Sequence, residues 1–301
     1  MNKRSHIFML LFASVLWGTT FVAQRIGAEL VGPYTYLAGR SWIAVVFLTP
    51  VVHAFDRFRA RRGMEDRRPR SADDRKRLLL AGIAAGVALC AASAAQQIGV
   101  AYTTASKAGF ITALYVVLVP ILSIVLGKRP SAHIWACVAL SLGGLYLLCV
   151  TGELKLQYGD AYELLSALLF AVEILLVYYF SPRLDGVRLS RMMFLVVAVL
   201  STALMFALET PTWASVRAAL PAIAYAGILS SGIAYTLQIL GQEDVNPTVA
   251  SLVMSLESVF SALSGWLVLG ERLTGRELLG AALMFAAIVL AQIEIKPRKR
   301  T

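Results

Sequence analysis

Ten long apolar stretches, separated by short polar segments, divide the chain. They cover roughly residues 6–27, 33–53, 78–98, 104–127, 132–150, 159–180, 191–208, 217–240, 247–270 and 275–294. Each is close to the roughly 20 residues that a helix needs to cross the hydrocarbon core of a bilayer. An unpaired backbone group in lipid costs several kcal/mol, and the alternating pattern of a membrane barrel is absent, so the pattern predicts ten transmembrane helices.

Composition supports a membrane protein. Of the 301 residues, 58% are hydrophobic and 15% are charged, whereas water-soluble domains carry about 25% charged residues. Lys3 and Arg4 precede the first apolar stretch as in a secretory signal, but no cleavage site followed by a soluble domain is present, so we expect a retained first span. The sequence therefore predicts an all-α integral membrane protein.

The basic residues indicate the orientation of the spans. With a cytoplasmic N-terminus, the inside segments hold 21 Lys and Arg and the outside loops hold 4. Basic residues concentrate on the cytoplasmic side of membrane proteins, so we expect both termini in the cytoplasm of a multi-pass protein of the bacterial inner membrane. In the loop 54–77, basic and acidic residues alternate, which favours a surface loop near anionic lipid headgroups over a nucleic-acid-binding arm.

A short repeat divides the chain into two halves. Residues 125–129 (VLGKR) end the fourth stretch, and residues 268–272 (VLGER) end the ninth, 143 residues later. Each half contains an odd number of spans, so the two halves should cross the membrane in opposite directions. We expect two five-helix repeats of inverted topology, residues 1–150 and 151–301, around a central cavity.

Three segments resemble a known family: residues 17–23 (WGTTFVA), residues 107–120 (KAGFITALYVVLVP), and residues 255–260 (SLESVF) followed by 269–272 (LGER). They are similar to EamA-type members of the drug/metabolite transporter superfamily, and most of all to bacterial exporters of aromatic and other amino acids. The resemblance implies ten helices, two inverted repeats and export of amino acids or other metabolites. The family commonly has Pro after the Glu of the ninth span, where this chain has Ser258, so no proline kink is expected there.

Three glutamates lie within the predicted spans. Glu173 and Glu257 fall near mid-depth, and Glu163 shares a helical face with Glu173 and Phe170. An ionisable group inside the bilayer is costly and faces either a wet cavity or a partner. These carboxylates could bind the solute and, if transport is coupled to protons, carry the proton, or they could form structural hydrogen bonds to neighbouring helices.

Aromatic, amide and cationic side chains complete the candidate site. Trp17, Phe21 and Gln24 share one side of the first span, which suits either an amphipathic solute or helix packing. Lys107 could bind a solute carboxylate or extend to the membrane surface, whereas Arg40 is expected to tie helices or to extend to the surface. The expected substrate-binding residues, which should line the cavity, are Trp17, Phe21, Gln24, Lys107, Tyr115, Glu163, Phe170, Glu173, Tyr235, Gln238 and Glu257.

The sequence thus favours a secondary transporter that exports small metabolites, amino acids above all, by alternating access. No nucleotide-binding loop, cofactor motif or metal-ligand spacing is visible. The alternatives are an intramembrane enzyme, either a protease or a lipid-modifying transferase, and a channel. His6, His53 and His133 all fall at span ends and no Asp is placed mid-span, which leaves an enzyme few groups for catalysis, and the inverted repeat argues against a channel.

Overall fold

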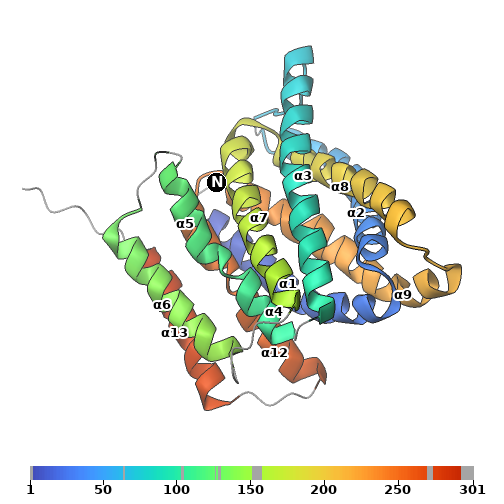
Figure 1. The fold of residues 1–301 in the computed structure, drawn as a ribbon. Coiled ribbons are helices and arrows are strands. Elements are labelled where there is room, and N and C mark those ends of the chain that lie inside the picture. Colours follow the sequence, from blue (N-terminus) through green and yellow to red (C-terminus); the bar gives the residue numbers. More distant parts are fainter. Residues whose placement is uncertain are drawn as a thin grey trace, which may run out of the picture.

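The described part of the chain is a bundle of long helices without strands (Figure 1). The structure is a computed structural model that describes residues 3–63, 65–102, 105–125, 127, 130–150, 158–269 and 274–292. Most of the two repeated turns and the basic C-terminal residues 296–300 lie outside this part. The helices are α1 Lys3–Leu30, α2 Pro33–Arg61, α3 Ala72–Tyr102, α4 Ala105–Thr112, α5 Tyr115–Val125, α6 Ala132–Cys149, α7 Tyr158–Phe180, η1 Ser181–Arg183, α8 Gly186–Leu208, α9 Trp213–Tyr225, η2 Ala226–Ala234, α10 Tyr235–Gly241, α11 Pro247–Met254, α12 Glu257–Leu269 and α13 Gly275–Ala291.

Nine helical stretches in the described ranges are long and apolar enough to cross a membrane. They correspond to the first nine predicted spans, and α13, with 17 residues, corresponds to the tenth. The prediction of an all-α membrane fold is confirmed. Several helices are longer than the apolar stretches that predicted them. For example, α2 continues to Arg61, so that polar residues of the expected loop 54–77 extend the helix beyond its apolar part.

The fourth and ninth spans are interrupted at matching places. The fourth breaks between α4 and α5 at residues 113–114, and the ninth breaks between α11 and α12 at residues 255–256, which is 142 residues later. At both breaks the backbone turns more tightly: Leu114 N–H donates to Ile111 O, and Leu256 N–H donates to Val253 O, each three residues back. Pro120 lies inside α5, after the break. Neither interruption therefore sits at a proline.

The packing partners repeat between the two halves. The helix α3 lies along α7, and the stretch α9–η2–α10 lies along α1 in the equivalent way. Two further long pairs are α2 with α8 and α6 with α13, the latter side by side at one flank of the bundle (Figure 1). Exchanging the first five spans for the last five reproduces this set of pairs. The arrangement is that of an inverted repeat.

Two ion pairs join α2 to α8 at one end of the bundle. This end carries the loop that follows α2, and we call it the basic end. Arg188 forms a bidentate pair with Asp56, with N–O distances of 2.9 and 2.7 Å. Arg59 Nη1 lies 2.6 Å from Asp185 Oδ2, and the side chain of Asp185 also caps the start of α8. Both members of the second pair are buried. An arginine network with one bidentate pair and one buried pair holds helix ends in a fixed register.

At the opposite end of the bundle, Glu209 at the end of α8 is hydrogen-bonded to the start of α2. Its two carboxylate oxygens accept hydrogen bonds of 2.8 Å from the backbone N–H groups of Tyr34 and Thr35, in the first turn of α2. A carboxylate at a helix N-terminus satisfies free N–H groups and interacts favourably with the helix dipole. Both ends of the α2–α8 pair are thus fastened by charged side chains.

A valine at Gly144 should separate α6 from α13. A Cβ atom at Gly144 would lie 2.6 Å from the carbonyl oxygen of Gly280, and one at Gly280 would lie 2.5 Å from the carbonyl oxygen of Gly144. Because backbone is the obstacle on both sides, we expect Gly144→Val to lower the unfolding free energy by at least about 1–3 kcal/mol, the usual cost of overpacking. Thermal unfolding in detergent measures the change. Gly143→Val is the matched control, since a Cβ there meets nothing within 4 Å, and an equal loss in both variants would contradict the prediction.

Candidate functional site

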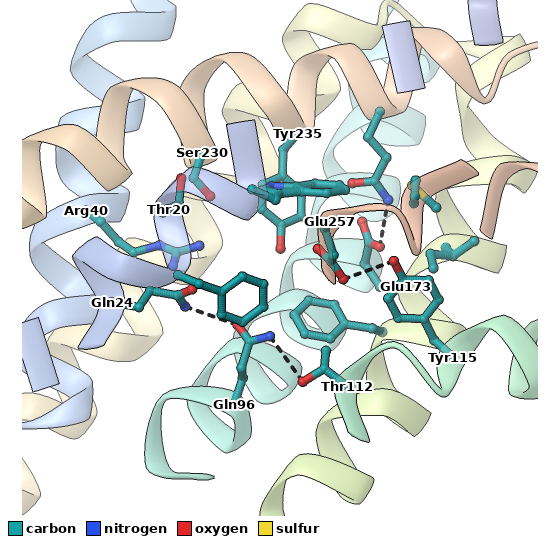
Figure 2. A pocket seen from close by; sticks show the side chains of 16 residues that line it. Thr20, Gln24, Arg40, Gln96, Thr112, Tyr115, Glu173, Ser230, Tyr235 and Glu257 are labelled. Carbon is teal, nitrogen blue, oxygen red and sulfur yellow. Dashed lines mark hydrogen bonds between the residues drawn. The ribbon is translucent and has the colours of Figure 1, made fainter. Parts of the chain in front are cut away.

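One cavity in the middle of the bundle collects side chains from both halves of the chain (Figure 2). It encloses about 40 Å³, room for about three water molecules. Nine of the eleven residues that the sequence predicted as lining meet there. The full lining is Trp17, Thr20, Phe21, Gln24, Arg40, Gln96, Thr112, Tyr115, Phe170, Glu173, Ile174, Ser230, Tyr235, Gln238, Met254 and Glu257.

Aromatic rings form one wall of the cavity. Trp17 on α1 packs edge to face on Tyr235 of α10, with ring centroids 5.0 Å apart, and Phe194 of α8 packs on the same tyrosine at 5.3 Å. Such pairs hold the rings in defined orientations. The indole Nε1 of Trp17 is buried and has no hydrogen-bond partner in the described residues. The wall therefore offers apolar surface together with one free donor.

Two carboxylates lie at one side of the cavity. Gln238 Nε2 donates to Glu173 Oε2 at 3.0 Å, and the hydroxyl of Tyr115 donates to Glu257 Oε1 at 3.0 Å. Glu173 Oε1 and Gln238 Oε1 are buried acceptors without a donor among the described residues. Buried acceptors are costly when unpaired, so this side of the cavity calls for a ligand or water that brings hydrogen-bond donors.

The Tyr115–Glu257 contact joins equivalent positions of the two halves. Tyr115 is the first residue of α5 and Glu257 is the first residue of α12, so each directly follows the break in its span. The two residues are 142 apart in sequence, the same offset as the two breaks. Gln96 and Gln238, which also line the cavity, are 142 residues apart as well. The cavity thus lies on the pseudo-two-fold axis that relates the halves.

Arg40 of α2 lies at the other side of the cavity, near Gln24 and Thr20 (Figure 2). It is buried, and its Nε donates to Ser231 Oγ of η2 at 3.1 Å. It thus ties α2 to η2, as expected, but it also lines the cavity, where the sequence did not place it. The described residues give Arg40 no carboxylate within ion-pair distance. A buried guanidinium without a counter-ion is expensive in a membrane, so this side of the cavity calls for an anionic group.

Hydrogen-bonded amides connect the cavity to Glu163. Gln24 Nε2 donates to Gln96 Oε1 at 3.1 Å, Gln96 Nε2 approaches Thr112 Oγ1 at 3.5 Å, and Thr112 donates to Glu163 Oε2 at 2.6 Å. Glu163 itself is fully buried against Gly99 of α3 and does not line the cavity. It lies behind the lining and accepts a hydrogen bond from the lining residue Thr112.

Lys107 is the remaining predicted residue. Its backbone belongs to α4, and its side chain lies outside the described part of the structure. The lining residues that sequence reasoning missed are Thr20, Arg40, Gln96, Thr112, Ile174, Ser230 and Met254. For Arg40 a signal was available: it is the eighth residue of its helix, about 10 Å along the axis at ~1.5 Å per residue, which is too deep for a simple surface position.

The comparisons with known proteins agree with the fold. The EamA-like transporter family matches residues 4–150 and again residues 157–292. The chain belongs to the EamA-like transporter family. It is a multi-pass membrane transporter of the drug/metabolite transporter superfamily, as the sequence motifs predicted.

Two individual proteins are similar to this EamA-like chain. A protein of Archaeoglobus fulgidus, described as an uncharacterized transporter, is 28% identical over 271 residues, which cover 88% of this chain and 78% of that protein. A solved crystal structure of a protein superimposes with a TM-score of 0.76 at 18% identity, and the match covers 97% of both chains. At this identity the second likeness supports the fold alone.

Proposed function

We propose that this protein is a secondary transporter that exports amino acids, including aromatic ones, by alternating access. The observation that carries the proposal is the charge layout of the central cavity. Arg40 lies at one side and the carboxylates Glu173 and Glu257 lie at the other, with aromatic rings between them (Figure 2). An amino acid has complementary parts: a carboxylate, an ammonium group and a side chain that can pack on rings.

The unpaired polar atoms fit the same ligand. Glu173 Oε1 and Gln238 Oε1 need donors, which an ammonium group supplies. Arg40 needs an anion, which the ligand carboxylate supplies in a bidentate hydrogen-bonding geometry. In a water-poor site, each charge-assisted hydrogen bond contributes roughly 1.5–3 kcal/mol. A zwitterion therefore satisfies both sides of the cavity at once.

The central cavity must widen before a solute can enter. At about 40 Å³ it is well below the roughly 300–1,000 Å³ of ligand pockets. We propose that residues 1–150 and 151–301 act as the two moving halves, and that the broken spans α4–α5 and α11–α12 change their relative angle. Rocking of inverted repeats around a site on their common axis is a known route to alternating access.

We also propose the orientation. The basic end faces the cytoplasm and both termini lie there, in a bacterial inner membrane, because Lys and Arg concentrate in those segments. Export then runs from the basic end to the opposite end. If protons are exchanged for the solute, Glu173 and Glu257 are the carboxylates placed to carry them.

Purified protein in liposomes tests the proposal. Liposomes loaded with unlabelled L-phenylalanine should accumulate external labelled L-phenylalanine by counterflow, and a panel of other amino acids should compete. Counterflow separates a carrier from a channel, which gives no accumulation. Failure of every amino acid would overturn the substrate class, and a catalytic change in the added solute would favour the enzyme alternative.

A further inference from the structure

A second and larger cavity lies at the basic end of the bundle. It has a volume of about 850 Å³, within the range of small-molecule sites. Its walls come from α5, α7, η1, the turn between α10 and α11, and the first residue of α11. The lining residues are Ser123, Leu175, Tyr178, Tyr179, Pro182, Arg183, Glu243, Asp244 and Pro247. Unlike the central cavity, it already has room for a metabolite.

Two buried polar atoms on residues that line this cavity lack partners in the described residues. Ser123 is 2% exposed, and its hydroxyl has no hydrogen bond. Glu243 Oε1 is likewise buried and unpaired. Buried polar atoms in proteins are nearly always paired with protein or water. An acceptor and a hydroxyl without partners, on residues that line a roomy cavity, favour a ligand that donates hydrogen bonds.

Glu243 and Asp244 line this cavity together with the cation Arg183, and the unpaired Oε1 of Glu243 is the atom that favours a cationic group. Glu243 has a 14% exposed side chain, and Arg67 pairs with its other oxygen, Oε2, at 3.1 Å. Burial raises the pKa of the Glu243 carboxyl, and the nearby Arg67 opposes this rise. Tyr178 and Tyr179 add ring faces to the same wall, and the guanidinium of Arg183 already lies 4.5 Å above the ring of Tyr179. A cation of the protein itself therefore already packs on one ring of this wall, as cation–π pairs do.

The two cavities are neighbours along α7. Glu173 and Ile174 line the central cavity, and Leu175 and Tyr178 line the second one. Glu173 and Tyr178 are about 7.5 Å apart along the helix axis at ~1.5 Å per residue. The second cavity therefore lies next to the central cavity along α7.

We propose that the cavity at the basic end is a loading site that binds the ammonium group of the solute before it enters the central cavity. Glu243 Oε1 is the acceptor, Ser123 provides a second polar contact, and the tyrosine rings pack on the organic part. This inference rests on the proposed function for the direction of transport. It assigns Glu243 a role only for solute that approaches from the basic end.

A pair of variants separates this role from a structural one. Glu243→Gln removes the carboxylate charge, and Arg67→Gln removes its ion-pair partner but keeps the carboxylate. Initial rates with labelled L-phenylalanine are measured from each side of liposomes with protein of known orientation. We expect Glu243→Gln to raise the half-saturation concentration about tenfold from the basic end, the effect of one lost charge-assisted hydrogen bond, with little change from the opposite end. Arg67→Gln should leave it unchanged or lower it.

Equal shifts from both sides, or the same rise in Arg67→Gln as in Glu243→Gln, would overturn the loading site. A second readout does not need transport. In a Ser123→Cys variant, phenylethylamine should slow the reaction of the new thiol with a maleimide, and Glu243→Gln should abolish this protection. If L-phenylalanine is not transported but protection is seen, the proposed substrate fails and the site stands. If transport is seen without protection, the site fails and the proposed function stands.

Discussion

A Glu257→Gln variant is expected to transport amino acids at a rate about 10–100-fold below that of the unchanged protein. Glu257 lies in the central cavity and accepts a hydrogen bond of 3.0 Å from the hydroxyl of Tyr115. The amide keeps the size of the side chain but loses the negative charge that the solute ammonium group would pair with. The loss of one charge-assisted interaction, roughly 1.5–3 kcal/mol, corresponds to this range of rates. Counterflow in liposomes measures it.

The contact with Tyr115 allows a control for position. Tyr115→Phe removes the hydroxyl that orients the carboxylate but leaves the charge, so we expect a smaller loss, no more than about tenfold. Glu29→Gln is a control for an exposed carboxylate, since Glu29 pairs with Arg25 near the end of α1 and has a 67% exposed side chain. Full activity of Glu257→Gln, with protein folded as shown by its melting temperature, would remove Glu257 from the binding site.

Depth along each helix explains why so much of the site could be predicted. Glu173 and Glu257 are charged residues far from the ends of apolar stretches, and such residues rarely face lipid. Trp17, Phe21 and Gln24 recur on one side of a helix, and the structure turns that side to the cavity. Glu163 shares a face with Glu173 but is ten residues away, about 15 Å along the axis at ~1.5 Å per residue. A shared face therefore did not bring it into the same cavity.

Other parts of the site depend on contacts that the sequence does not contain. Gln96 and Thr112 join the lining because α3 and α4 pack beside α1 and α7. The breaks in the fourth and ninth spans could not be read from proline: Pro120 lies within α5, and the break at residues 255–256 has none. What repeats is the position of the break. The two breaks lie 142 residues apart, and so do Tyr115 and Glu257, the residues that directly follow them.

An Arg40→Gln variant is expected to lose binding of solutes that carry a carboxylate and to lose far less binding of solutes without one. Arg40 is buried in the central cavity with a hydrogen bond to Ser231 and no carboxylate partner in the described residues. If it binds the carboxylate of the solute, the variant should transport L-phenylalanine about 10–100-fold more slowly, because a bidentate charged contact is lost. The amide of phenylalanine, which lacks the negative charge, should lose far less. Competition by each compound against labelled L-phenylalanine measures both affinities.

A further variant distinguishes recognition of the carboxylate from tying of helices. Ser231→Ala removes the hydroxyl that holds Arg40 Nε on η2 but keeps the guanidinium. It should weaken binding of L-phenylalanine and its amide alike and only slightly, because the hydrogen bond that it removes joins two protein side chains and the guanidinium charge stays. If Arg40→Gln weakened both compounds equally, Arg40 would serve only to join α2 to η2. A loss confined to the free acid would instead require an anion-binding group on this side of the cavity, and Arg40 is the one cation in the described lining.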